Sequence, residues 1–567
     1  MLLELNSSPA QQADLAALLA AQKDPDSPLY HHWLSPAEFG ARFGADDADL
    51  AQVTAWLMTQ GFTIDEIHAG RRLITFSGSA AQVATTFRTD LHIYRVNGAD
   101  HLANVHDPQI PATLSNLVAG IVSLHDFRRT SEMRSRTPLD AQPDYSAGAT
   151  HYLFPADFAT IYDLNPLFAA GTSGTGTSIA VAARSNIKLG DIEAFRSTAS
   201  LTANDPTITL DGPDPGLVAH DQDESTLDAE WSGAVAPAAA VNLVVAASTA
   251  TTDGIDLASA WIVNHSAAPV VSVSYGSCEQ NMGATELAFY NSLWEQAATQ
   301  GMSVFVASGD AGAAGCSEPT TSAGSQAAVN GLCSSPYVTC VGGTELNEGA
   351  NAAQYWSSAN SASYGSALSY IPEEVWNESV SNGGTGLWSS GGGASVVYPQ
   401  PAWQANIDGV AVANGMRAVP DVALAAADHD GYFVAENGSF WIASGTSASA
   451  PSFAGIMALV VESQHGAPQG NANPRLYALA NSTDDPFHPT PSGDNTVSGV
   501  AGFTATGATY NLATGLGSVD ATLLVRGWSS ASQNIPQPRP IRCSRFSLLP
   551  TRCMPVPRTP IRLPGWP

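Results

Sequence analysis

A serine within residues 445–451 has the surroundings of a catalytic nucleophile. The segment reads Gly-Thr-Ser-Ala-Ser-Ala-Pro, and Ser447 is its third residue. A Gly-Thr turn lets the backbone bend sharply before a helix, and Pro451 suits the first helical turn. Ser447 would then lie near a helix N-terminus, where backbone N–H groups and the helix dipole favour the negative charge of an oxyanion. The alternative is an ordinary N-cap, which any serine-rich turn can supply.

Two carboxylates, rather than a histidine, lie where the base for this serine is expected. A subtilisin-type triad has its histidine upstream of the serine, but the His-Gly pair of this chain, His465-Gly466, lies downstream. Glu224 and Asp228 are spaced i and i+4, so on a helix they share one face. Mutual repulsion raises one apparent pKa of the pair, which can accept the serine proton at a pH where imidazole is already protonated. The alternative is two solvated carboxylates on an acidic surface helix.

A third acidic residue, Asp310, follows the strand-like run 304–307 in the sequence Ser-Gly-Asp-Ala-Gly. An Asp between glycines at the carboxyl end of a strand is placed to face a site. In its protonated form it could donate a hydrogen bond to an oxyanion. The alternative is a turn residue that caps its own backbone.

The charge balance of the chain favours an acidic working environment. There are 51 acidic residues against 22 basic ones, a formal net charge of −29, and residues 197–416 contain no Lys or Arg. Lowering the pH protonates unpaired carboxylates and relieves their repulsion. A generic acidic, soluble protein is the alternative. The lack of a basic stripe disfavours nucleic acid as a partner, and no stretch is long and apolar enough for a membrane span.

Hydrophobic patterning divides the chain into four parts. Residues 1–128 read as a compact α+β unit, and 129–149 as a polar, exposed linker. Residues 150–528 alternate strands and helices, which predicts a mostly parallel sheet flanked by helices. Residues 529–567 form a Pro- and Arg-rich tail, read as disordered or as a reading-frame artefact. The main expected strands are 72–76, 91–96, 178–183, 241–247, 270–275, 303–307 and 337–341, and the main expected helices are 11–22, 46–60, 285–300 and 450–462.

Cysteines argue for an oxidising compartment, although residues 1–5 do not resemble a signal peptide. Of six cysteines, four lie in the central region without metal-binding spacing: Cys278, Cys316, Cys333 and Cys340. Two disulfides are expected, and four free buried thiols are the alternative.

With its three motifs in this order, the chain resembles the sedolisins, or serine-carboxyl peptidases, over residues 2–528. Further matching runs are 30–39, 76–79, 103–104 and 107–111 in the N-terminal part, and 272–276, 391–395 and 420–421 beyond it. The resemblance implies a subtilisin-like α/β catalytic domain, preceded by a ferredoxin-like, kumamolisin-type activation prodomain. By similarity the disulfides would be Cys278–Cys316 and Cys333–Cys340.

The same resemblance implies a role for each candidate site residue. Ser447 would attack the peptide carbonyl, Glu224 would act as general base and then acid, and Asp228 would orient Glu224. Asp310, protonated, would stabilise the oxyanion. The implied substrate-binding residues are Ser274, Tyr275, Gly276, Gly392 and Gly393.

These roles describe a self-processing, acid-active endopeptidase that acts on protein or peptide substrates. Its own prodomain would inhibit it until cleavage within 129–149. We expect a secreted monomer whose missing signal peptide reflects a misplaced gene start. The alternatives are a tripeptidyl-peptidase of the same family, and a non-catalytic secreted binding protein on this scaffold.

One family feature is degenerate in this chain. Sedolisins usually bind one calcium ion near the C-terminus through two Asp side chains and a glycine carbonyl. The corresponding positions here are Pro489, Thr509 and Asn511. Calcium prefers about 6–8 oxygen ligands, usually with carboxylate charge. The sequence therefore predicts a calcium site that is lost or much weakened, and no other cofactor.

Overall fold

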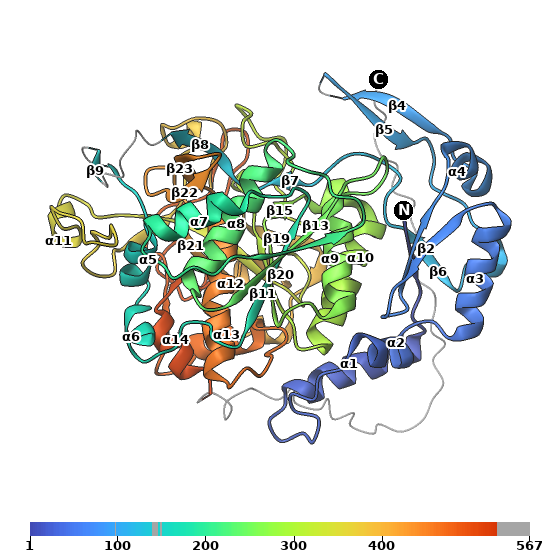
Figure 1. Ribbon diagram of the computed structural model, residues 1–567, viewed down its shortest axis with the longest axis horizontal. Helices are drawn as coiled ribbons and strands as arrows, with labels where there is room; N and C mark the ends of the chain where they lie inside the picture. Colours follow the sequence, from blue (N-terminus) through green and yellow to red (C-terminus); the bar gives the residue numbers. More distant parts are fainter. Residues whose placement is uncertain (97, 139–145, 148–149, 530–567) are drawn as a thin grey trace, which may run out of the picture. The chain divides into compact units, whose positions relative to one another are not determined.

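The computed structural model describes residues 1–96, 98–138, 146–147 and 150–529 (Figure 1). Predictions for residues 139–145, 148–149 and 530–567, the tail with its two cysteines included, lie outside the described residues. Within the described ranges, no helix is long and apolar enough to cross a membrane.

The N-terminal part has the expected α+β architecture, drawn in blue in Figure 1. An antiparallel sheet of order β2-β3-β1-β6 buries Leu3, Phe76 and Ile121 against helix residues Val53 and Phe87. Helices α1, α2 and α4 each begin at a capping box, formed by Ser8 with Gln11, Ser35 with Glu38, and Ser79 with Gln82. The bounds are β1 (Leu2–Leu5), α1 (Pro9–Lys23), α2 (Pro36–Phe43), α3 (Asp47–Thr59), β2 (Thr63–Ile67), β3 (Leu73–Ser77), α4 (Ala80–Phe87), β4 (Leu91–Val96), β5 (Ala99–Asn104), η1 (Ala112–Leu114) and β6 (Val118–Ile121).

A mostly parallel sheet forms the centre of the remaining chain, which confirms the predicted fold class. Its strand order is β12-β13-β11-β14-β16-β17-β18, with β21 also beside β17, and β18 is the antiparallel member. The bounds are β11 (Ser178–Ala183), β12 (Thr207–Asp211), β13 (Ala240–Ala246), β14 (Val270–Val273), β16 (Ser303–Ala307), β17 (Thr339–Leu346), β18 (Glu373–Val375) and β21 (Val422–Ala425). The predicted strand 270–275 is split, because β14 ends at Val273 and Tyr275 begins a separate strand, β15 (Tyr275–Gly276).

Helices cover both faces of this sheet, as the near-continuous apolar strands require. Alternate residues of β11 pack into different cores: Val181 lies with helices α8 (Asp221–Val235) and α12 (Thr446–Ser463), whereas Ala182 lies with α9 (Gly254–His265) and α10 (Glu279–Thr299). This alternation follows from the two-residue period of a strand. Consequently α8 and α12, which carry the candidate base and nucleophile, lie on one face and contact each other.

Shorter elements complete the described chain. They are β7 (Thr130–Ser131), β8 (Arg134–Pro138), β9 (Ser146–Ala147), β10 (Thr150–His151), α5 (Pro155–Ile161), α6 (Asn165–Ala169), α7 (Leu189–Thr198), α11 (Ala352–Tyr355), η2 (Val380–Asn382), β19 (Gly393–Pro399), η3 (Ala402–Gln404), η4 (Val410–Ala413), β20 (Met416–Val419), β22 (Tyr432–Glu436), β23 (Ser439–Ser444), α13 (Asn473–Ala480), β24 (Phe487–His488), β25 (Ser518–Val519) and α14 (Ala521–Gly527).

The first residues of the predicted linker are not exposed. Strand β7 pairs with β15, and β8 pairs with β23. Arg129 and Glu132 are buried, with 3% and 8% of their surface exposed. The prediction of an exposed linker was therefore wrong for this segment, because backbone pairing and buried ion pairs compensate its polar side chains.

Candidate active site

Glu224 and Asp228 lie one turn apart on α8, and neither side chain is exposed. The alternative of a solvated surface pair is therefore wrong. Burial raises the pKa of both carboxyls, that of Asp228 to about 8, and repulsion from Asp228 adds to the rise for Glu224. The hydroxyl groups of Ser131 and Ser447 oppose the rise in the pKa of Glu224. The two carboxyls consequently titrate as a pair that holds protons well above the usual carboxylate range.

Ser274 connects this pair to the nucleophile's helix. Its hydroxyl donates to Asp228 Oδ1 at 2.6 Å and makes a longer contact, 3.4 Å, with the carbonyl oxygen of Ser447. That carbonyl lacks its usual helical donor, because Pro451, four residues later, has no N–H. Helix α12 begins at Thr446, so Pro451 lies inside the helix. The prediction that Pro451 belongs to the first helical turn was therefore wrong.

Ser447 occupies the N-terminal turn of α12, as predicted, with its hydroxyl beside Ser274, the residue between β14 and β15. Ser447 Oγ donates to the carbonyl oxygen of Ser274 at 3.3 Å. Its backbone N–H points away from the helix and donates to the carbonyl oxygen of Glu132 at 2.9 Å. A backbone N–H in the first turn of a helix, which has no partner within the helix, is the kind of donor that holds an oxyanion.

Asp310 follows β16 and faces the start of α12. Its Oδ1 accepts hydrogen bonds from the N–H and the hydroxyl of Thr446, both at 2.8 Å. Its Oδ2 is buried without a hydrogen-bond partner among the described residues. Burial raises the pKa of Asp310 to about 7, against the opposing effect of the Thr446 hydrogen bonds. Gly445 permits this approach, since its φ is 113° and a Cβ there would lie 2.3 Å from Asp310 Oδ2.

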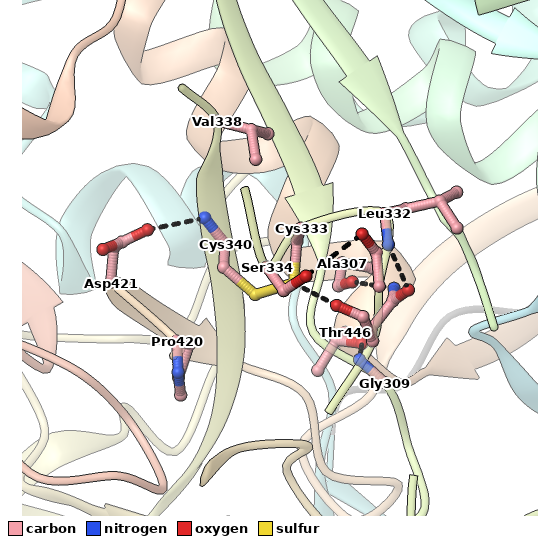
Figure 2. The surroundings of a disulfide bond; sticks show 12 residues. Ala307, Gly309, Leu332, Cys333, Ser334, Val338, Cys340, Pro420, Asp421 and Thr446 are labelled. Carbon is pink, nitrogen blue, oxygen red and sulfur yellow. Dashed lines mark hydrogen bonds between the residues drawn. A yellow bond between two sulfur atoms is a disulfide. The ribbon is translucent and has the colours of Figure 1, made fainter. Parts of the chain in front are cut away.

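Both expected disulfides are present, and they flank the segment that carries Asp310. Cys278–Cys316 joins the residues after β15 to the loop after Asp310. Cys333–Cys340 is fully buried near the end of β16 (Figure 2). In the same view the N–H of Gly309 donates to the hydroxyl of Thr446 at 3.2 Å, which ties the Asp310 turn to α12. The hydrogen bonds of Gly309 and Asp310 with Thr446 fix the turn against the helix, and the Cys278–Cys316 disulfide restrains the loop beyond it.

The linker crosses this site in an extended conformation. Thr130 and Ser131 pair antiparallel with Gly276 and Tyr275. The N–H of Glu132 donates to the carbonyl oxygen of Ser274 at 3.1 Å. The predicted substrate-binding residues Ser274, Tyr275 and Gly276 therefore contact an extended chain next to Ser447.

The other two predicted substrate-binding residues have different neighbours. A side chain at Gly392 would meet Leu512 and Pro420, and one at Gly393 would meet Val329 and Phe503. Their part in substrate binding stays a prediction.

Sequence reasoning missed the linker residues that occupy the site. Glu132 lies beside Asp310, and the Ser131 hydroxyl donates to Glu224 Oε2. Nothing in the sequence singled them out, because Thr-Ser-Glu in a polar stretch has no catalytic spacing. Only the partner strand β15 gives the segment its position.

The positions expected to hold calcium contain neutral groups. Asn511 accepts hydrogen bonds from two backbone N–H groups, and its amide donates to the hydroxyls of Thr490 and Thr514 at 2.9 Å. An amide N–H at a ligand position repels a cation, and Pro489 has no side-chain oxygen. Among the described residues, no cluster of three or more His, Cys, Asp or Glu could hold a metal. This donor set does not fit calcium, which prefers carboxylates. Loss of the site remains a prediction.

Comparisons with known proteins cover both parts of the chain. Residues 3–127 match the family model "Pro-kumamolisin, activation domain". Sedolisin from Pseudomonas sp. strain 101 is 29% identical over 520 residues, which covers 90% of this chain and 84% of that protein. Kumamolisin from Bacillus sp. strain MN-32 is 29% identical over 530 residues, covering 88% and 86%. Human tripeptidyl-peptidase 1 is 27% identical over 498 residues, covering 82% and 80%.

A solved structure extends the likeness to the fold. Pseudomonas sedolisin, a serine-carboxyl proteinase complexed with two molecules of pseudo-iodotyrostatin, superposes with a TM-score of 0.57 at 27% identity, covering 68% of this chain and 99% of that one. Together with the N-terminal family match, these relatives confirm the resemblance stated from the motifs. The chain is thus similar to the sedolisins, which are serine-carboxyl peptidases, over most of its length, and its residues 3–127 match a pro-kumamolisin activation domain.

Proposed function

We propose that the chain is the proenzyme of an acid-active serine endopeptidase whose nucleophile is Ser447. One observation carries the proposal: a buried carboxyl pair, a helix-terminal serine and an unpartnered Asp310 oxygen surround one extended segment of chain. These are the base, nucleophile and oxyanion donor of an acyl transfer. Two disulfides support a site of action outside the cytoplasm.

Each group has one task in the proposed reaction. Ser447 Oγ bonds to the carbonyl carbon of the substrate while its proton passes to Glu224. The negative oxygen receives hydrogen bonds from the Ser447 N–H and from protonated Asp310. Glu224 then gives the proton to the departing amine nitrogen, and water releases the acyl group by the same route. Asp228, which accepts a hydrogen bond from Ser274 one turn away from Glu224, tunes Glu224 by raising its pKa through repulsion.

The protonation states require acid. Asp310 donates a hydrogen bond only when protonated, which holds below its pKa of about 7. Glu224 accepts a proton only when ionised, and burial opposes its ionisation. Part of that burial comes from the linker, whose Ser131 contacts Glu224. The Ser131 hydroxyl that donates to Glu224 Oε2 favours the ionised carboxylate and lowers the pKa of Glu224 against the effect of burial, so the base can act while the linker is bound.

The course of the linker favours an endopeptidase over a tripeptidyl-peptidase. Arg129, Thr130 and Ser131 precede Glu132 in the cleft, and the chain continues toward the N-terminal domain. A tripeptidyl-peptidase needs its cleft closed beyond the third residue before the cleaved bond. Digestion of a folded protein at acid pH should therefore give peptides of varied length, whereas a ladder of tripeptides would favour the alternative.

The decisive experiment follows the mass of the full chain after acidification to about pH 4. We expect the wild type to lose its N-terminal domain and the variant Ser447→Ala to remain intact. Ser449→Ala is the matched control, because Ser449 lies on the same helix and only donates to the carbonyls of Leu424 and Ala425. This control should be processed like the wild type.

Two outcomes would contradict the proposal. One is an intact, folded wild type at every value between about pH 3 and pH 6. That result would favour the non-catalytic binding protein. The other is equal processing of the wild type and Ser447→Ala, which would place the nucleophile elsewhere.

A further inference from the structure

The linker lies in the cleft as a peptide substrate would, with Glu132 next to the nucleophile. The N–H of Glu132 donates to Ser274, and its carbonyl oxygen accepts from the N–H of Ser447 at 2.9 Å. An oxyanion donor marks the carbonyl that is attacked. The carbonyl of Glu132, and no other linker carbonyl among the described residues, accepts this hydrogen bond.

We propose that self-processing cuts the Glu132–Met133 bond, and that the pocket around the Glu132 side chain selects substrates with Glu or Gln before the cleaved bond. This inference rests on the proposed function and names its first substrate and its specificity. In the step, Ser447 Oγ bonds to the Glu132 carbonyl carbon as the bond to the Met133 nitrogen breaks. The serine proton passes through Glu224 to that nitrogen, and water then frees the Glu132 carboxyl group.

Ion pairs on both sides of Glu132, a buried one at Arg129 and a partly exposed one at Arg134, fix the register of the linker. The Arg129 guanidinium contacts Asp256 at 3.1 Å and Glu286 at 3.0 Å, and its backbone N–H donates to Asp253. On the other side, Arg134 pairs with Glu378. Because a shift by one residue would break both anchors and reverse the side chains, Glu132 is held opposite Ser447.

The pocket supplies a donor that needs an acceptor. The backbone N–H of Asp310 donates to Glu132 Oε2 at 3.1 Å. Glu132 Oε1 lies against Gly276, where an added Cβ would approach it to 2.1 Å. A Glu or Gln oxygen satisfies the Asp310 N–H. Leu leaves that N–H unpaired and Lys sets one donor against another, so both should bind poorly.

The charged groups around Glu132 favour its side chain in the neutral, protonated form when it lies in the pocket. Asp310 and Glu318 face it, Glu224 lies beyond Ser131, and the nearby cation Arg134 acts on Asp310. Among the described residues Glu132 has no ion-pair partner. Burial and the two facing carboxyls raise the pKa of Glu132 well above its ordinary value. Glu before the cleaved bond should therefore be preferred in acid, whereas Gln should be accepted over a wider pH range.

The first test uses the full wild-type chain, acidified and sampled over time, with N-terminal sequencing of each new fragment. The earliest new N-terminus should be Met133, and the released fragment should end at Glu132. An earliest cut at another bond, dependent on Ser447, would overturn this inference and leave the proposed function intact. Loss of all cleavage would instead count against the proposed function.

The second test uses the processed enzyme and synthetic peptides with the sequence of residues 128–138. Peptides carrying Glu, Gln, Leu or Lys at the position of Glu132 are compared by kcat/KM at about pH 4. Glu and Gln should agree within about tenfold, and Leu and Lys should fall at least about tenfold below them. Toward neutral pH the Glu peptide should lose more than the Gln peptide. Equal rates for Glu, Leu and Lys would overturn the specificity.

Full-chain variants repeat the comparison in the proenzyme itself. Glu132→Gln should still be processed, and Glu132→Lys should be processed at least about tenfold more slowly. Glu193→Gln, an exposed position on α7, is the matched control and should behave like the wild type. Unchanged processing of Glu132→Lys at the same bond would contradict the pocket's role.

Discussion

At the scale of single residues, protonation decides what the site can do. Asp310 Oδ2 is buried without a partner, and Glu224 Oε1 is likewise without one among the described residues. In the proposed reaction, Asp310 Oδ2 acts when it carries a proton, and Glu224 Oε1 acts when it does not. A site that needs both states has a pH window set by two carboxyl groups of different environment.

Replacement of Asp310 tests whether the reaction needs a protonated carboxyl group at this position. Asp310→Asn keeps an acceptor for Thr446 and a donor for the oxyanion at every pH, whereas Asp310→Ala removes both. We expect kcat/KM to fall about 10²–10³-fold for Asp310→Ala and much less for Asp310→Asn. The wild type loses the Asp310 proton as pH rises through about 7. The activity of Asp310→Asn should therefore persist to a higher pH than that of the wild type. Equal losses in both variants would contradict the donor role.

Glu224→Gln tests whether the reaction needs an ionised carboxylate at this position. The amide has the shape of the carboxyl group but cannot accept the serine proton, so peptide hydrolysis should fall by at least about 10²–10⁴-fold. The melting temperature should not fall, because the variant removes a buried ionisable group. Glu230→Gln is the control: Glu230 is buried on the same helix and accepts from the N–H of Ala435, which Gln also permits. Retained activity of Glu224→Gln would show that the base lies elsewhere.

At the scale of elements, the site forms where α8, α12 and the turn after β16 meet. Packing of both helices on one face of the sheet brings Glu224 and Ser447, distant in sequence, to the same place. Pro451 inside α12 frees the Ser447 carbonyl for Ser274, and Gly445 admits Asp310. The Cys278–Cys316 disulfide then restrains the loop beyond Asp310.

Removal of this disulfide should destabilise the fold. It closes a loop of 38 residues, for which chain entropy predicts a loss of about 4 kcal/mol. We expect this loss in Cys278→Ala/Cys316→Ala, measured by urea denaturation in a Ser447→Ala background that cannot process itself. Either single replacement should cost about as much as the pair, since each already breaks the bond. Losses that add up from the two single variants would contradict the interpretation.

At the scale of the whole molecule, we expect buried carboxyl groups to make the folded chain more stable in acid than at neutral pH. Burial raises the pKa of Glu4, Asp310 and Glu345 to about 7 and that of Asp228 to about 8. The folded state therefore holds more protons than the unfolded chain between the ordinary and the raised pKa values. Their contribution to stability is fully present below about pH 4 and is lost as pH rises through 7 to 8.

Thermal unfolding of full-length Ser447→Ala should show the same dependence of stability on pH. The melting temperature should be highest near about pH 4 and should fall by several degrees toward about pH 8. Ion-paired Glu378 acts in the opposite direction, because its pKa of about 2 means that its contribution is lost only in strong acid. A melting temperature that rises from acid to neutral pH would contradict the prediction.

Much of the fold could be predicted because local signals are strong. The strand at 178–183 and the strand at 303–307 were predicted with their observed bounds, since each is a short apolar run that is buried on both faces. The motifs around Ser447, Glu224 and Asp310 were found because their residue types, spacing and order match those of the sedolisins. Helix α12 began earlier than its predicted 450, because the proline signal that usually marks a first turn lies inside it.

The sequence by itself determined the α/β fold class and the candidate Ser, Glu and Asp residues through periodicity and motif spacing, and the pairing of the cysteines followed from the resemblance to the sedolisins. Only the tertiary structure decided that Glu224 and Asp228 are buried, and that Asp310 has one unpartnered oxygen. It alone put Glu132 beside Ser447. The physical reason is that burial, and with it each pKa, depends on contacts between segments far apart in sequence. A polar linker carries no local sign of the strand with which it pairs.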